Sequence, residues 1–582
     1  MRALGLALFL VAAGCSIYND VKYVGDGGAD HSVVSDMVSD GGTTPDLVAP
    51  DLLPVCTSSA TCPSDKPICD TASGVCRTCV VDTEDSTCAA KSASTPYCSA
   101  TGTCVECKQS GQCSTAKPIC STAGACVACG SSADDAICMA RDTTKAHCEF
   151  TSGANLGQCV ECAQSSQCPT AKPVCELATT DATRNQCRGC VAHSECGADK
   201  LCNKGDIDAA TKGQCVTPVI VDKNAAGGCK SSGAEAKPWC ELQQALDNEP
   251  TPGSGPLYLL VKGPVTVGSE YLRAAITDSS TNKNVVIVGT GGATVLEDKQ
   301  IGFRVSLSTG AANVVLESLT FGQAMGTGAN NLKNAGIQCV GTGATVKLTV
   351  RSSTVQQVLT GPGITSTDCN LAVDAVTAVG NQGAGLQTSG ATLVVDASTF
   401  VGNQGAGAAI NSPTEYRVQN SLFAKNTVSG VAFDGTSPSS SSRFWFNTLV
   451  GNGAASTKGG LNCGALSSGT RPIAASIVAF NAKTTGATGT QLNGDCEFTD
   501  VVAGVDEGAT TTGLIKQDPA LVNAASTATD PAALRSAYSL SASDTVCKDK
   551  IDVAAGQPAA DLFGTRRPQG TKLDIGAHEL VQ

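Results

Sequence analysis

Two aspartates occupy the same place in two nearly identical segments of the chain. Asp374 lies in Leu371-AVDAVTAVGNQGAG, and Asp396 lies in Leu393-VVDASTFVGNQGAG, 22 residues later. Because Leu371 and Val373 alternate with other residue types, we expect them to face inward and the aspartates to face outward. If consecutive segments stack as neighbouring strands, the two carboxylates lie about 5 Å apart. Such carboxylates repel, so the pair favours a bound cation such as Ca²⁺, a shared proton or an adjacent arginine.

Paired carboxylates could also act as the general acid and base of a polysaccharide lyase or a glycoside hydrolase. Exposed aspartates in a repeat are more often solvated, however, and no histidine or arginine can be assigned as a base beside them. The four histidines are scattered, which argues against a metal site, and no G-x-S-x-G motif occurs. Aromatic residues make up only 4% of the chain, too few for a glycan platform built on ring stacking, and no groove rich in lysine or arginine is predicted. We therefore assign no catalytic residue and no metal, and keep Asp374 and Asp396, with Gln419 and Trp445 continuing their column, as a candidate cation or ligand site.

The repeat that would position these aspartates continues along the chain with a period of 22 to 29 residues. The next copies are Tyr416-RVQNSLFAKNTVSG, Arg443-FWFNTLVGN and Arg471-PIAASIVAFN. Aligned in this way, the copies place one asparagine in each turn: Asn381, Asn403, Asn426, Asn452 and Asn481. This pattern predicts an all-β fold, a right-handed parallel β-helix over 217–582.

The geometry of a coil explains why asparagine should recur. Successive coils lie about 4.8 Å apart, so side chains of one type stack above one another. Asparagine amides at the bend can hydrogen-bond from coil to coil, and asparagine tolerates the left-handed backbone that we expect at such bends. The alternative fold, an antiparallel β-sandwich, does not produce an asparagine register. The stretch Glu241-LQQALDN predicts a short helix near the start of this domain.

A different repeat precedes the predicted β-helix. Between Cys56 and Cys215 lie 24 cysteines, arranged in six consecutive units of four that are joined by C-x-x-C steps such as Cys76/Cys79. Units of about 25 residues are too small to fold on a hydrophobic core, so we expect two disulfides to stabilise each one. Zinc binding at the C-x-x-C steps is the alternative, and the export signal described below favours disulfides. The sequence thus predicts a disulfide-rich stalk over 56–216, with its connectivity left open.

The cysteines of the predicted β-helix are few. The predicted disulfides there are Cys229–Cys240, Cys339–Cys369 and Cys463–Cys496. The chain has 32 cysteines, so lipidation of Cys15 leaves an odd number. Cys547 is then the unpaired residue.

The N-terminus reads as an export signal. Met1-Arg2 precedes the apolar run Ala3 to Ala13, which is followed by Gly14-Cys15-Ser16. This resembles a bacterial lipobox, in which the cysteine is lipidated, and the resemblance implies that Ser16 permits sorting to the outer membrane. We expect a lipoprotein signal peptide over 1–15. The aspartate-rich segment 16–55 is expected to be a disordered acidic tether.

The C-terminal segment Asp561-LFGTRRPQG-Thr571-KL-Asp574-IGAHE resembles the closing motif of a family of bacterial surface β-helix proteins (D-x-x-G-x-x-R-P, then D-I-G-A-x-E). Together with the cysteine-rich repeats, it makes the chain similar to a Gram-negative, myxobacterial-like lipoprotein with a pectin-lyase-like β-helix. We expect the motif to complete the final coil. Within it, Asp574 and Glu579 are expected to pair with Arg566 or Arg567 in a structural role.

The layout of anchor, tether, stalk and β-helix predicts a lipid-anchored protein of the outer membrane, displayed on the cell surface. The formal net charge of −13, with no basic run, argues against nucleic acid as a partner. We expect binding or adhesion to a polysaccharide or a surface protein, with the asparagine ladder as a repetitive contact face. A carbohydrate-active enzyme working in the outer groove and a structural envelope spacer are the alternatives. No cofactor is expected apart from the Ca²⁺ that the aspartate pair could hold.

Overall fold

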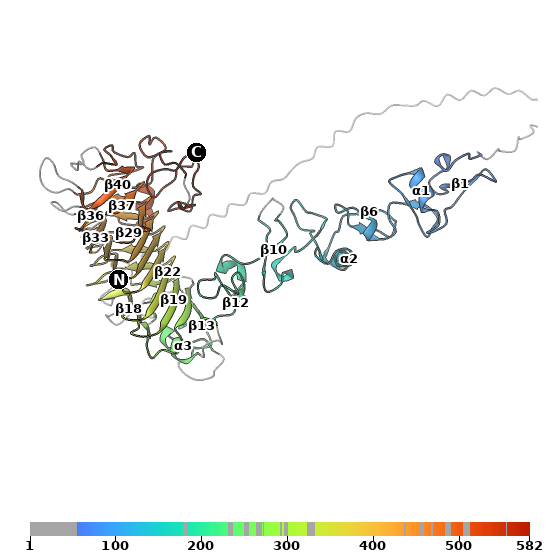
Figure 1. The fold of residues 1–582 in the computed structure, drawn as a ribbon. Coiled ribbons are helices and arrows are strands. Elements are labelled where there is room, and N and C mark those ends of the chain that lie inside the picture. The colour runs from blue at the N-terminus through green and yellow to red at the C-terminus, as the bar shows by residue number, and fades with distance from the viewer. Residues whose placement is uncertain are drawn as a thin grey trace, which may run out of the picture. The chain divides into compact units, whose positions relative to one another are not determined.

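The computed structural model divides the chain into two compact units, Met1–Val105 and Glu106–Gln582. The first contains the first two four-cysteine repeats, here called modules one and two; the second contains modules three to six and the β-helix (Figure 1). In the described parts of the chain, no helix is long and apolar enough to cross a membrane. The predicted signal peptide with Cys15 and the predicted tether up to residue 54 lie outside the described residues. The structure describes 55–581 except 179–182, 231–236, 250–254, 264–270, 272, 291–293, 296–300, 323–331, 436–437, 454–458, 467–469, 483–490, 505–511 and 554–555.

Each module consists of a helical turn followed by a two-stranded antiparallel hairpin that carries its third and fourth cysteines. The hairpin strands are β1 (Ile68–Asp70), β2 (Val75–Arg77), β3 (Tyr97–Cys98), β4 (Cys104–Val105), β5 (Ile119–Cys120), β6 (Cys126–Val127), β7 (His147–Cys148), β8 (Cys159–Val160), β9 (Val174–Cys175), β10 (Cys187–Arg188), β11 (Leu201–Cys202) and β12 (Cys215–Val216). The helical turns are η1 (Ser59–Thr61), α1 (Asp85–Lys91), η2 (Ser110–Gln112), η3 (Ser132–Asp134), α2 (Asp135–Arg141), η4 (Ser165–Gln167) and η5 (His193–Cys196).

In all six modules the first cysteine bonds to the third and the second bonds to the fourth. This confirms the predicted disulfide-rich region and shows that each C-x-x-C step joins two modules without a bond across it. Three sulfur atoms lie within 4.8 Å of one another in several modules because the two disulfides of a module are adjacent. These sulfurs are already bonded, so they are not thiolate ligands for zinc.

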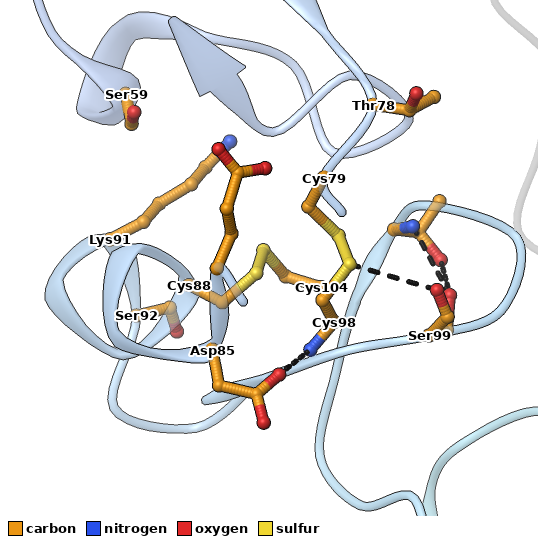
Figure 2. The surroundings of a disulfide bond; sticks show 12 residues. Ser59, Thr78, Cys79, Asp85, Cys88, Lys91, Ser92, Cys98, Ser99 and Cys104 are labelled. Atoms are coloured by element: carbon orange, nitrogen blue, oxygen red, sulfur yellow. Dashed lines mark hydrogen bonds between the residues drawn. A yellow bond between two sulfur atoms is a disulfide. The ribbon is translucent and has the colours of Figure 1, made fainter. Parts of the chain in front are cut away.

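Figure 2 shows how module two holds its two disulfides, Cys79–Cys98 and Cys88–Cys104. Asp85, the first residue of α1, accepts a hydrogen bond of 2.8 Å from the backbone N–H of Cys98. Modules of the shorter type use a serine hydroxyl for the same purpose, as Ser59 does for Cys69 at 3.1 Å. One side chain of the helical turn therefore fixes the third cysteine where it can reach the first.

The β-helix consists of three parallel sheets, seen as stacked arrows in Figure 1, to which each coil contributes up to three strands. Sheet one contains β13 (Val219–Val221), β14 (Leu257–Val261), β16 (Asn284–Gly289), β19 (Ala311–Glu317), β22 (Thr345–Arg351), β25 (Asn370–Asp374), β28 (Thr392–Asp396), β31 (Glu415–Gln419), β34 (Arg443–Trp445), β37 (Arg471–Ala474) and β40 (Cys496–Thr499). Sheet two contains β17 (Thr294–Val295), β20 (Thr320–Phe321), β23 (Thr354–Gln356), β26 (Thr377–Val379), β29 (Thr399–Val401), β32 (Leu422–Ala424), β35 (Thr448–Val450), β38 (Ile477–Ala479), β41 (Val501–Val502) and β42 (Leu514–Ile515). Sheet three contains β15 (Ala274–Thr277), β18 (Ile301–Ser306), β21 (Ala335–Val340), β24 (Ile364–Thr367), β27 (Leu386–Ser389), β30 (Ala408–Asn411), β33 (Val431–Asp434), β36 (Leu461–Cys463) and β39 (Leu492–Gly494).

This architecture confirms the predicted right-handed parallel β-helix and excludes the antiparallel sandwich. Inward residues of successive coils stack as expected; the rings of Phe400 and Phe423, for example, lie parallel with centroids 5.0 Å apart. At the N-terminal end, α3 (Leu242–Asn248) forms within the stretch expected to be helical and buries Leu242 and Leu246 against the first coils.

The five aligned asparagines form one continuous ladder inside the coil. The side-chain amide of Asn381 donates to Asn403 at 2.9 Å, Asn403 donates to Asn426 at 2.8 Å, and the pattern continues to Asn481. All five are buried, so the ladder cannot be a contact face, contrary to our expectation. The left-handed backbone also falls one residue earlier than expected: it is adopted by Gly380 and Lys425, among others, and not by the asparagines.

The C-terminal motif does not complete the last coil, contrary to our expectation. It packs on the outer face of sheet two, together with α4 (Pro531–Ala537), because the outward residues of that sheet are apolar there, Leu422 and Val450 among them. Within the motif, the guanidinium of Arg567 is fully buried, lies 3.6 Å from Glu579 and donates to the carbonyls of Asp574 and Gly576. The basic partner of Glu579 is thus Arg567.

The structure joins Cys229 to Cys240, Cys339 to Cys369 and Cys463 to Cys496. The Cys339–Cys369 and Cys463–Cys496 bonds each join two neighbouring coils. Cys339, Cys463 and Cys496 lie in strands, and Cys369 directly precedes β25. Cys547 is the free cysteine of the described residues and is fully buried beneath the C-terminal motif.

A polar column and an arginine groove on the outer face of sheet one

The predicted aspartates belong to a column of polar residues at the ends of successive strands of sheet one. Glu317, Arg351, Asp374 and Asp396 end β19, β22, β25 and β28, and each is the direct register partner of the next. Gln419 and Trp445, which end β31 and β34, pair in the same way and continue the column. The column therefore runs across six coils, with Asp374 directly beside Asp396 as the repeat indicated.

Each member of the aspartate pair already has protein partners. The carboxylate of Asp374 lies 3.4 Å from Nε of Arg351, and its side chain is 48% exposed. Burial raises the pKa of Asp374, Arg351 opposes this shift, and the charge of Asp396 adds to it. The two oxygens of Asp396 accept hydrogen bonds from the amides of Gln419, at 2.8 Å, and Asn420, at 3.0 Å.

These contacts make the pair a poor fit for Ca²⁺. The ion takes six to eight oxygen ligands, usually several of them carboxylates. Here the guanidinium of Arg351 already lies beside Asp374, and both oxygens of Asp396 face N–H donors. Of the three ways to relieve the repulsion between two carboxylates, the protein uses arginine and amide donors.

At its N-terminal end, at Glu317 and Arg351, the column becomes an ionic cluster between the β-helix and module six. The carboxylate of Glu317, with a side chain only 6% exposed, lies 2.5 Å from Nζ of Lys204 and 3.2 Å from Nε2 of His193. Arg351 contacts both Glu317, at 3.4 Å, and Asp206, at 2.8 Å. Although burial favours the neutral acid, the nearby imidazole of His193 and the hydrogen bond from Lys204 lower the pKa of Glu317 to about 2. The cluster thus holds a buried carboxylate ionised where the stalk meets the β-helix.

A groove lies beside the C-terminal part of the column, which Asp396, Gln419 and Trp445 form. It has a volume of about 470 Å³ and is lined mainly by residues of β28, β31 and β34, together with Ser441 and with Gly556 of the C-terminal region. Arg417 and Arg443 line it as direct register partners on adjacent strands, and both are exposed. The guanidinium of Arg443 is oriented by two hydrogen bonds of 2.8 Å to the carbonyls of Ser440 and Ser442.

The rest of the groove combines polar and apolar contacts. The half-buried indole of Trp445 forms part of its lining, and Nε1 of that ring donates to Gln419 at 2.9 Å, which fixes the ring. Glu415 is its one acidic lining residue in the described chain. The lining therefore offers two guanidinium groups, one carboxylate and one aromatic ring within two to three coils.

Our expectation that no basic groove exists was wrong. The sequence has no run of lysine and arginine at this place: Arg417 and Arg443 are 26 residues apart and meet only because that distance is one turn of the coil. The signal was present in the alignment of Tyr416-RVQ with Arg443-FW, which places one arginine above the other.

Comparisons with known proteins add little to this picture. No protein-family model and no curated protein matches the chain. A solved structure described as "Crystal structure of pectate lyase Pel9A" aligns with a TM-score of 0.36 and 13% sequence identity, over 66% of this chain and 100% of that chain. Similarity at this level carries no argument about activity, so the function must be argued from the site itself.

Proposed function

We propose that the protein is a cell-surface binding protein whose β-helix holds an acidic polysaccharide in the groove of sheet one. The single observation that carries this proposal is the register pair of exposed arginines, Arg417 above Arg443, beside the fixed ring of Trp445. The two arginines stand one coil apart, on strands whose backbones are about 4.8 Å apart in the stacking direction. That spacing suits a chain that presents one anionic group after another.

Arginine suits this role for chemical reasons. Its planar guanidinium donates two parallel hydrogen bonds to a carboxylate or a sulfate, which a lysine ammonium cannot do. The indole of Trp445 offers an apolar edge for the C–H face of a sugar ring, while Glu415 can accept a hydrogen bond from a hydroxyl. Most of the lining belongs to β28, β31 and β34, so an extended polymer could follow the groove across successive coils.

The enzyme alternative depends on one observation, the raised pKa of Asp374 beside a second carboxyl group, that of Asp396. A raised pKa is what a general acid needs. The amide donors on Asp396 and the arginine on Asp374 give both groups a structural task, however. Sustained cleavage of a polyuronate by the wild-type chain, lost in Asp374→Asn, would favour the enzyme over the binding protein.

Anchoring by a lipid on Cys15, with display on the outer membrane, belongs to the same proposal. It is supported by the lipobox-like Gly14-Cys15-Ser16 and by twelve stalk disulfides, which suit an oxidising compartment. A stalk of this kind would hold the groove away from the membrane. The envelope-spacer alternative shares this location but predicts no ligand.

The test measures binding of the full chain to polygalacturonate and to heparin, an acidic and a sulfated polymer, at low and high salt. We expect the variant Arg417→Ala/Arg443→Ala to bind at least about tenfold more weakly, and wild-type binding to weaken as salt increases. Lys347→Ala is the matched control, because Lys347 is exposed on the same face of sheet one and outside the groove. Equal binding by the double variant and the wild type, or no binding of either polymer, would refute the proposal.

A further inference from the structure

Because the stalk modules repeat, a residue of one module can be compared with the residue at the equivalent position of another module of the same type. Modules two and four belong to the same long type, and their helices, α1 and α2, begin with the equivalent residues Asp85 and Asp135. Asp135 accepts a 2.8 Å hydrogen bond from the backbone N–H of Cys148, as Asp85 does from Cys98. Residues that differ between the two modules are therefore not required to hold the disulfides.

Module four departs from module two where two potential cations appear. Lys145 and His147 take the places of Thr95 and Tyr97 of module two. The imidazole of His147 is held in place, because its Nδ1 lies 2.8 Å from the carboxylate of Asp135. The shared aspartate thus has a second task in module four, the orientation of a histidine, and the other ring nitrogen, Nε2, is left for a ligand.

The hairpins of modules four and five also depart from the repeat. Cys148 and Cys159 are 11 residues apart, whereas the equivalent Cys98 and Cys104 are only 6 apart. The longer hairpin of module four reaches module five, where Asn155 donates to the side chain of Asn185 at 3.0 Å. Asn185, only 2% exposed, in turn donates to the carboxylate of Glu149 at 2.8 Å. The two modules are therefore joined by buried polar contacts that fix their relative placement.

These departures line a single cleft between the two modules. The cleft has a volume of about 720 Å³, and its lining includes Lys145, His147, Asn155, Arg184 and Gln167. Glu161 is the one carboxylate among the described residues that line it. The guanidinium of Arg184 is positioned by hydrogen bonds to the carbonyls of Leu177 and Ser152, and Asp135 is the partner of the imidazole. Lys145 and Arg184 outnumber the lining carboxylate of Glu161, which favours a small anion, and the volume of the cleft lies within the range of ligand sites.

We propose that this cleft is a binding site for a small anionic sugar, a polyhydroxylated molecule that carries a carboxylate or a sulfate. Lys145, Arg184 and His147 would receive the anionic group, and the amides of Asn155, Gln158 and Gln167 would receive its hydroxyls. The site lies on the stalk and does not depend on the groove of sheet one. It would take a single sugar unit, whereas the groove is open to a polymer.

The experiment uses the full chain carrying Arg417→Ala and Arg443→Ala, so that the groove contributes no signal. Glucuronate and N-acetylglucosamine 6-sulfate are titrated as probes, with glucose as the uncharged comparison, and binding is followed by saturation-transfer NMR and calorimetry. The test variant is Lys145→Thr with His147→Tyr, which restores the residues that module two carries at these places. Lys117→Thr, an exposed lysine of module three outside the cleft, is the matched control.

We expect at least one anionic probe to bind, with an affinity that falls at least about tenfold in the test variant and is unchanged in the control. Non-reducing peptide mapping of the test variant should show the wild-type disulfides, which separates loss of the site from loss of the fold. The proposal is overturned if neither anion binds, if the test variant binds as well as the control, or if glucose binds as tightly as the anions. Failure of the groove experiment would leave this result untouched.

Discussion

Replacing Asn403 by alanine tests whether the buried amide ladder stabilises the β-helix. The side chain of Asn403 is fully buried and makes four hydrogen bonds. Its Oδ1 accepts from the backbone N–H and the amide of Asn381, at 3.1 and 2.9 Å. Its Nδ2 donates to Oδ1 of Asn426 at 2.8 Å and to the carbonyl of Ala378 at 3.2 Å.

The magnitude follows from what the truncation leaves behind. Oδ1 of Asn426 still accepts from the backbone N–H of residue 403, and the amide of Asn381 keeps the carbonyl of Val355 at 3.3 Å. The backbone N–H of Asn381, a fully buried residue, loses the acceptor that Asn403 provided. Since a buried unsatisfied group costs about 1–3 kcal/mol and a small cavity adds to this, we expect the free energy of unfolding to fall by about 3 kcal/mol.

Guanidinium unfolding of the full chain with its disulfides intact, followed by circular dichroism, measures this change. Asn313→Ala is the matched control, since Asn313 also donates its amide to the coil below, to Asn284 at 3.1 Å, but does so in solvent. We expect the control to change the free energy by no more than about 0.5 kcal/mol. A loss below about 1 kcal/mol for Asn403→Ala, or equal losses for the two variants, would refute the reasoning.

Three further predictions concern other parts of the chain. Glu317→Gln should destabilise the protein by about 3 kcal/mol at neutral pH. The pKa of Glu317 is about 2 in the folded state against an ordinary 4.5, so the carboxylate stabilises the folded state above pH 4.5, and this gain is lost as the pH falls toward 2. Unfolding curves of wild type and variant should therefore differ at about pH 7 and converge at about pH 2. Proteolysis under non-reducing conditions, with mass spectrometry, should find disulfide-linked peptides only within modules in the stalk, and any link between two modules would contradict the first-to-third, second-to-fourth pairing. Cys15→Ser should move the protein from the membrane fraction to the soluble fraction of cells, and an unchanged distribution would contradict lipid anchoring.

The β-helix was predictable because its repeat carries a physical requirement. Each coil must satisfy buried backbone groups at the same bend, and one asparagine per coil does so, as Asn381 and Asn403 show. The backbone conformation at this bend was harder to predict from the sequence. The left-handed residue could not be assigned from residue type, because glycine at 380 and lysine at 425 adopt the same conformation at equivalent places.

The disulfide pairing was not predictable from spacing, since four cysteines allow three connectivities. The hairpin decides between them. It places the third and fourth cysteines on facing strands, as Cys98 and Cys104 are, and each bonds to a cysteine that precedes the hairpin, Cys79 or Cys88. The Glu317 cluster was less accessible still, because Lys204 and Asp206 lie outside the coil repeat and more than one hundred residues from their partners.

Repetition also shows where to look for function in a protein of this kind. Positions that every coil or module keeps, such as the ladder asparagines and the aspartate of the long modules, are explained by the fold. Positions that break the repeat without a structural need are not: Arg417 and Arg443 stand where the two preceding coils have Ala372 and Val394, and Lys145 stands where module two has a threonine. Both departures introduce positive charge beside a hollow in a chain whose net charge is −13. Such local inversion of the overall charge is hard to explain by solubility and is what selective binding of an anion requires.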